Sequence, residues 1–182
     1  MENTNEYIAL RNEIISSSNY QKGYISLLYT VAAAIFAFAF TQEEPLIFLV
    51  PIVVIIPIYL LNMRECVGML KLGCYLHVFY EEDNPGWETR LKNYHEKFKD
   101  IRADIDPYVF LSFCGPVICG WKLCYGGLYN VETILKLIFA FICLLACLCI
   151  IKKYNIDYIN AREKYVNEWK TIKQEENQNC IK

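Results

Sequence analysis

The chain has 182 residues, of which 55% are hydrophobic and 21% charged, and its formal net charge is −2. Typical domains hold roughly 100 to 150 residues, so two full domains would be cramped and we expect one domain with its membrane anchor. The apolar residues come in long blocks, which favours a membrane protein over a soluble one. The slightly negative charge offers no global attraction for nucleic acid, so direct RNA binding is not expected.

The N-terminal part of the chain predicts a surface helix followed by a first membrane span. Residues 1–22 place Tyr7, Leu10 and Ile14 at helical spacing, which predicts an amphipathic helix lying on the membrane. Residues 23–40 are uncharged. At about 1.5 Å per residue they measure about 27 Å, close to the roughly 30 Å of a hydrocarbon core. No cleavable signal peptide is expected, so this span directs insertion.

A second span is expected to return across the bilayer after the polar turn at residues 41–45. Residues 46–61 are apolar and contain Pro51 and Pro57. Proline is tolerated inside a membrane helix where neighbouring groups satisfy the freed carbonyls, so this span should be bent and packed against protein. Residues 23–61 therefore predict a transmembrane helical hairpin.

The next segment, residues 62–107, is charged and predicts a cytoplasmic helical segment. The helix of the second span is expected to run on towards Phe79. After the turn at residues 81–86, apolar side chains recur at spacings of four and three, which forms a seam along a helix. The seam comprises Trp87, Leu91, Tyr94, Phe98, Ile101 and Ile105. Such a seam requires a partner helix.

Residues 108–151 predict a second apolar helical hairpin. Its first half, 108–129, contains Pro116, Lys122 and several glycines, and we expect it to be broken or only partly embedded. Its second half, from residue 133, is a cleaner span, in which Lys136 lies near one end and can reach the headgroups.

The C-terminal residues 152–182 predict a cytoplasmic helix and tail that continue the fourth span. Their apolar side chains again step by three and four, which favours packing against the first seam. The tail seam comprises Ile151, Tyr154, Tyr158, Ala161, Tyr165, Trp169 and Ile172. The fold class expected is thus an all-α integral membrane protein, with a multi-span helical membrane layer and a cytoplasmic helical bundle.

The distribution of positive charge predicts the orientation. Residues 62–107 and 152–182 each carry seven Lys or Arg, whereas the turn at 41–44 carries none. Because loops rich in Lys and Arg stay in the cytoplasm, both termini and the 62–107 segment are expected there.

Two ladders of small residues on the first span allow another helix to approach closely. One ladder contains Ser26, Thr30 and Ala34, and the other contains Ala33, Ala37 and Thr41. Packing against the second span of the same chain is the favoured interpretation, ahead of contacts between protomers.

No metal site or cofactor is expected. Six of the nine cysteines lie in apolar stretches, where a thiol behaves as a small apolar side chain. The remaining three lack partners at metal-ligand spacing, as does His77.

The segment RLKNYH, Arg90 to His95, matches the R-x4-H spacing of HEPN ribonucleases. In that family the arginine holds the phosphate and the histidine supplies acid and base chemistry. Residues five apart on a helix differ by about 140°, however, and Glu96 and Asp100 would repel RNA. We therefore expect Arg90 and His95 to be structural and the chain to have no catalytic residue.

The chain as a whole resembles the small membrane accessory proteins encoded beside type VI-B CRISPR RNA-guided ribonucleases, of the kind that enhances defence. Its length, early apolar spans, charged cytoplasmic helices and degenerate RLKNYH motif carry the resemblance. The first half, through NPGWE at residues 84–88, also resembles a broader set of bacterial multi-span proteins.

The resemblance implies a homo-oligomeric pore, an octamer, that depolarises the bacterial inner membrane when the RNA-guided nuclease senses phage transcripts. Two other interpretations stay open: a membrane-tethered HEPN-type ribonuclease, and a non-enzymatic membrane adaptor that docks a partner.

Overall fold

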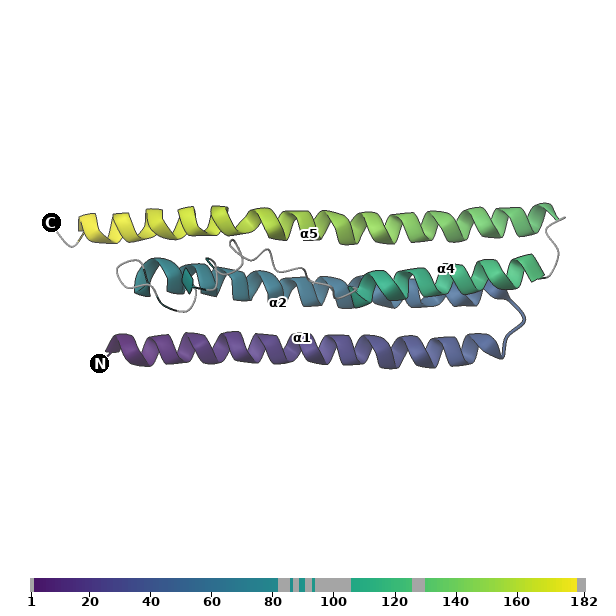
Figure 1. The fold of residues 1–182 in the computed structure, drawn as a ribbon, viewed down its shortest axis with the longest axis horizontal. Coiled ribbons are helices and arrows are strands. Elements are labelled where there is room, and N and C mark those ends of the chain that lie inside the picture. The colour runs from purple at the N-terminus through teal and green to yellow at the C-terminus, as the bar shows by residue number, and fades with distance from the viewer. Residues whose placement is uncertain are drawn as a thin grey trace. The chain divides into compact units, whose positions relative to one another are not determined.

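The structure is a computed structural model, and the residues that it describes are almost entirely helical. They are residues 2–81, 86, 89, 90, 93, 106–125 and 130–179. Four long helices and one short 3-10 helix follow one another in this part of the chain (Figure 1). They are α1 (Glu2–Phe40), η1 (Pro45–Leu49), α2 (Val50–Tyr80), α4 (Pro107–Tyr125) and α5 (Val131–Asn179). No strand occurs in these ranges, so the all-α class is confirmed.

All four long helices are long and apolar enough to cross a membrane. The segments are Asn5–Phe40, Pro45–Tyr80, Pro107–Tyr125 and Val131–Asn179, and each contains an apolar window with at most two charged side chains. A helix satisfies its own backbone hydrogen bonds, which lipid cannot do. By length and composition, the structure therefore contains the several membrane-compatible helices that the sequence predicts.

The N-terminal helix and the first expected span form one element. α1 is continuous from Glu2 to Phe40, so the expectation of a separate surface helix within residues 1–22 is wrong. The serines at 16–18 do not end the helix, and a Cβ at Gly23 would meet nothing within 4 Å. Serine and glycine cost at most about 1 kcal/mol each in a helix, which the long flanking segments outweigh.

The third apolar block is one unbroken helix over its described residues, 108–125, so the expected break does not occur there, whereas the alternative of partial embedding stays a prediction. Pro116 lies inside α4 and is buried. A proline removes one backbone hydrogen bond, and the helix continues past it where packing holds the flanking turns in place. The two predicted extensions are confirmed: α2 runs on to Tyr80 and α5 continues to Asn179.

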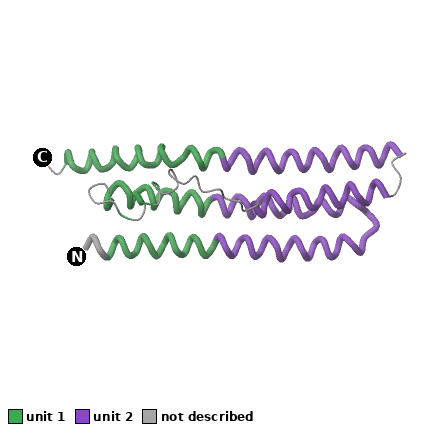
Figure 2. Tube along the Cα trace, in the orientation of Figure 1, with its two compact units in different colours: residues 1–20, 64–103, 156–182 green, residues 21–63, 104–155 purple. Residues whose placement is uncertain are grey.

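The described chain divides into two compact units, shown in different colours in Figure 2. Unit 1 contains residues 1–20, 64–103 and 156–182, and unit 2 contains residues 21–63 and 104–155. The units divide after residues 20, 63, 103 and 155, and the segment boundaries expected at residues 22, 61, 107 and 151 stay predictions. Unit 2 thus holds most of the expected membrane layer, and unit 1 holds the charged segments.

In unit 2, α2 and α4 are the central helices. In their most apolar windows 44% and 39% of the residues are buried, whereas the windows of α1 and α5 are each only 17% buried. Gly115 of α4 lies against the backbone oxygen of Phe48 in η1, where a Cβ would not fit. The absence of a side chain at residue 115 therefore lets α4 approach the 3-10 helix closely.

In unit 1, side chains of α2 contact both α1 and the tail of α5. Tyr75 donates a hydrogen bond to the Glu6 carboxylate at 2.8 Å, and its ring lies 5.0 Å from the Trp169 ring. The Trp169 indole nitrogen donates to the backbone oxygen of Lys71 at 3.2 Å. Lys173 donates to the Val78 oxygen at 2.8 Å, near the end of α2, where helix carbonyls lack partners within the helix.

The tail seam therefore packs on α2. Tyr165 lies under the Lys71 ammonium, 5.0 Å from ring centroid to nitrogen, and Tyr158 is half-buried. The seam expected to be its partner lies outside the described residues. Those residues are Trp87, Leu91, Tyr94, Phe98, Ile101 and Ile105.

Candidate functional site

The small-residue ladders of α1 lie on the exposed face of that helix. Every member is exposed: Ser26, Thr30, Ala33, Ala34, Ala37 and Thr41. The buried positions of α1 are instead Leu28, Ala32 and Ala39. Residues two apart on a helix differ by about 200°, which places the ladder that begins at Ser26 nearly opposite Leu28.

The favoured expectation, that these ladders pack against the second span of the same chain, is therefore wrong. Larger side chains make that contact: the ring of Phe36 stacks 6.3 Å from that of Phe48, and Phe40 meets Phe48 edge-on at 5.0 Å. The ladders are left as a surface of small side chains on a peripheral helix.

This surface carries hydroxyl groups that are satisfied within the helix. Thr30 donates through Oγ1 to the Ser26 backbone oxygen at 2.9 Å. A hydroxyl bonded to its own helix can face an apolar neighbour without leaving its donor unpaired. The face is therefore compatible with close contact to another helix or to lipid.

Short, exposed side chains at three- and four-residue spacing also occur in the N-terminal part of α1, in unit 1. They were not identified from the sequence. Ala9, Asn12, Ser16 and Asn19 step by three, four and three, and all four are exposed. Steps of three and four between short side chains would have identified them, whereas the two ladders were defined by four-residue steps alone.

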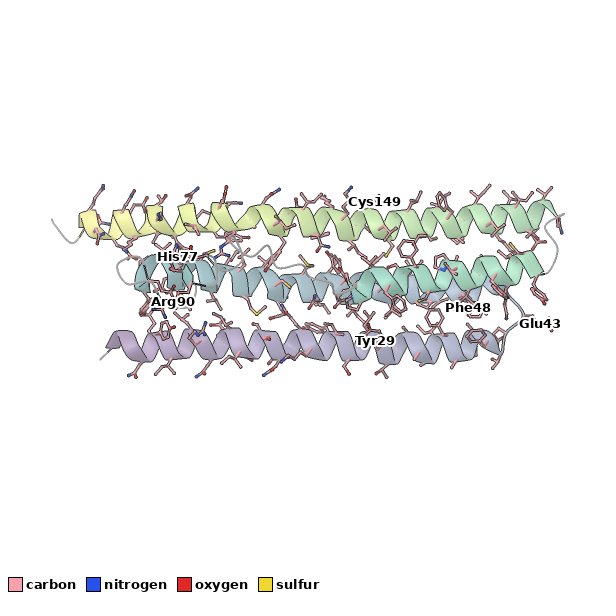
Figure 3. All side chains as sticks on the ribbon, viewed as in Figure 1. Tyr29, Glu43, Phe48, His77, Arg90 and Cys149 are labelled. Atoms are coloured by element: carbon pink, nitrogen blue, oxygen red, sulfur yellow. The ribbon has the colours of Figure 1, made fainter. Side chains whose placement is uncertain are left out.

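A second cluster of interactions surrounds the turn at residues 41–49 in unit 2, where Figure 3 labels Glu43 and Phe48. Lys122 of α4 donates to the Gln42 backbone oxygen at 2.8 Å and lies 5.1 Å from the Phe48 ring centroid. Lys136 of α5 lies 3.1 Å from a carboxylate oxygen of Glu44. The hydrogen bond from Lys136 lowers the pKa of Glu44 below its usual value.

The neighbourhood of Arg90 is organised by a buried carboxylate. Glu81, only 4% exposed, accepts hydrogen bonds from the Thr89 backbone nitrogen at 2.8 Å and from Thr89 Oγ1 at 3.0 Å. His77 Nδ1 lies 3.0 Å from the same hydroxyl, and Figure 3 labels this histidine and Arg90. Both hydrogen bonds join Thr89 to Glu81, directly after α2, and satisfy this buried carboxylate.

Arg90 itself is exposed, and its backbone nitrogen bonds the Gly86 oxygen at 3.1 Å. His95, the other half of the RLKNYH motif, lies outside the described residues. The geometry of the motif therefore stays a prediction from sequence.

Among the described residues no group of three or more His, Cys, Asp or Glu side chains could hold a metal ion. Cys74, Cys119 and Cys147 are buried and form no disulfide among the described residues. Cys147 lies 3.2 Å from Ser112 Oγ, so this thiol takes part in a polar contact between α5 and α4.

Comparisons with protein-family models, with curated proteins and with solved structures find no match to this chain.

Proposed function

We propose that this chain is the subunit of a homo-oligomeric pore that depolarises the bacterial inner membrane. The pore enhances antiviral defence by an RNA-guided CRISPR ribonuclease, a link that rests on the resemblance described above. The exposed small-residue face of α1 is the observation that supports self-association most directly. In this proposal both termini face the cytoplasm.

Small side chains on the surface of a membrane helix favour its association with another helix. Lipid tails are as apolar as leucine, so membrane helices associate through close packing, interhelical hydrogen bonds and lipid entropy. Small residues at three- and four-residue spacing allow such packing, and in α1 they point away from the interior of their own chain. A second copy can use a surface that the chain itself leaves open.

Repeated copies of one subunit can close into a ring that encloses a pore. A contact between two different faces of identical subunits repeats around a ring when the rotation closes. The described chain has two peripheral membrane-compatible helices, α1 and α5, whose apolar windows are each 17% buried. They supply two different lateral faces, and the resemblance implies eight copies.

A substitution at Ala33 tests this assembly. Ala33→Leu adds bulk to the small-residue face, and Ala33→Ser, which keeps the side chain small at the same exposed position, serves as the matched control. Each 1.4 kcal/mol lost at an interface lowers affinity about tenfold, so Ala33→Leu should reduce both the mass in mild detergent and ion flux across proteoliposomes. Ala33→Ser should change neither.

Cross-linking adds a direct measurement. Ala33→Cys should form cross-links between copies, whereas Ala32→Cys, whose side chain is 3% exposed in this chain, should not. A wild-type chain that is monomeric in mild detergent and passes no ions in liposomes contradicts the pore. RNA cleavage that is lost in His95→Ala, in a chain that still assembles, would favour the ribonuclease instead.

A further inference from the structure

Two lysines, one from α4 and one from α5, contact the turn at residues 41–49. Lys122 comes from α4 and contacts the Gln42 backbone oxygen and the Phe48 ring. Lys136 comes from α5 and lies 3.1 and 3.2 Å from the two carboxylate oxygens of Glu44. All of these residues belong to unit 2.

The contacts of Lys122 and Lys136 with the turn differ in chemistry. The partners of Lys122 are a peptide carbonyl and an aromatic ring, neither of which titrates, and the lysine is half-buried. Lys136 instead pairs with carboxylates, those of Glu44 and of Glu132 on its own helix, whose side chains are 49% and 68% exposed. Exposed ion pairs are weakened by dissolved salt, whereas the Lys122 contacts depend less on it.

In the described part of unit 2, the other polar contacts of α5 lie near its middle, and Asn155 Oδ1 accepts one of them from Tyr59. Cys147 meets Ser112, and the Ile151 backbone oxygen accepts a hydrogen bond from Tyr59 at 3.0 Å. Both contacts lie further along α5 than Lys136. Near its first turns, the polar contact described between α5 and the turn is the one to Glu44.

We propose that Lys136 and Glu44 form an ionic latch that holds the beginning of α5 against the 41–49 turn and opens when salt or acid weakens the pair. Lys122 keeps the turn on α4 in both states. The titratable groups that face Lys136 are Glu44 on the turn, Glu132 on its own helix and the Cys119 thiol of α4, and Glu43 is exposed on the turn next to Glu44. This inference does not depend on the proposed pore.

Distance measurement between spin labels tests the latch. Glu43 and Val131 are both exposed, belong to neither ion pair and flank the latch on the turn and on α5. Labels attached there through genetically encoded ketone side chains leave the native cysteines in place. The full chain is measured in lipid nanodiscs at low salt and at about 1 M salt, where the screening length falls to about 3 Å.

At low salt the chain with an intact latch should show one short separation, and at high salt a second, longer population should appear. Lys136→Gln and Glu44→Gln should show the longer population at both salt concentrations. Glu132→Gln is the matched control: it removes an ion pair of Lys136 within α5, and should leave the low-salt distribution unchanged.

Identical distributions in all chains at both salt concentrations overturn the latch. The latch is also overturned if Glu132→Gln lengthens the label separation as much as Lys136→Gln does. A change of charge on α5 would then be enough to move the helix, without loss of the pair with Glu44. If either latch variant does not fold, the salt titration of the labelled chain with its latch intact decides the question.

Discussion

The two units of the chain hold their helices together in different ways. In unit 1 the contacts are made by large aromatic side chains and by lysines bonded to backbone oxygens, as at Trp169 and Lys173. Unit 2 has such contacts too, at Phe48 and Lys122, but there α4 also meets η1 at a glycine, Gly115, and apolar side chains are exposed along the peripheral helices. A seam of large residues therefore marks a contact in unit 1, whereas apolar side chains in unit 2 do not by themselves distinguish interior from surface.

The largest effect is expected at the glycine contact of unit 2. In Gly115→Ala the new Cβ would meet the Phe48 backbone oxygen, and a backbone atom cannot move aside as a flexible side chain can. Overpacking of this kind typically costs about 1 to 3 kcal/mol, and this buried site should lie at the upper end or above it. Thermal unfolding in detergent measures the loss.

Gly120→Ala is the control for that change, because it lies on the same helix and its Cβ would meet Leu137 Cδ2 at an ordinary 3.7 Å. It should be neutral or slightly stabilising, since alanine favours a helix over glycine. Equal melting temperatures for the two variants would show that α4 does not approach η1 through Gly115.

The next effect in size concerns the aromatic contacts of unit 1. Trp169→Ala removes two aromatic contacts, to Tyr75 and Phe79, and the hydrogen bond to Lys71. Because Trp169 is only half-buried, the loss should fall below the roughly 3 to 5 kcal/mol of a fully buried tryptophan. Denaturant unfolding measures it, and Ile159→Ala, at a residue 72% exposed, should change stability little. Equal losses of stability in Trp169→Ala and Ile159→Ala would mean that Trp169 makes no specific contact with α2.

A smaller effect is expected at the turn that follows α2. In Gly86→Ala the new Cβ would meet the Glu81 side chain, which can shift only by weakening its hydrogen bonds to Thr89. A typical hydrogen bond contributes about 1 kcal/mol, so a loss of that order is expected in denaturant unfolding. Gly68→Ala, with nothing within 4 Å of its Cβ, should instead stabilise the helix by up to about 1 kcal/mol. Equal changes in stability for Gly86→Ala and Gly68→Ala would contradict the close contact between Gly86 and the Glu81 side chain.

The smallest effect is a dependence of stability on pH in unit 2. The hydrogen bond from Lys136 lowers the pKa of Glu44, so the folded chain holds this carboxylate charged to lower pH than the unfolded chain does. The stabilisation is therefore present above the unfolded pKa and is lost as the pH falls through the lowered folded value. Because Glu44 is exposed, the difference should be small. Melting temperatures between about pH 3 and pH 6 should fall less steeply for Glu44→Gln, and parallel curves would contradict the ion pair.

Several elements could be predicted from particular residues. The uncharged run at 23–40 and the apolar block from residue 133 identify helices long enough for a bilayer, because length and apolarity are properties of a short stretch of chain. The three- and four-residue spacing of Tyr158, Tyr165 and Trp169 also predicted that the tail stays helical, and these three side chains are half-buried. The continuity of α1 was missed, since three serines and a glycine weaken a helix signal without ending the helix.

The sequence by itself determined which segments are helical and apolar, since periodicity and length act within each segment. Only the tertiary structure decided which face of each helix meets which partner. Ser26, Thr30 and Ala33 looked like the inner face of α1, yet they are exposed. The partners of Lys122 and Lys136 lie 80 and 92 residues away in sequence, beyond the reach of any local pattern. The physical reason is that lipid can cover any apolar face, so hydrophobicity alone cannot select the buried one and the choice falls to packing and polar contacts between distant segments.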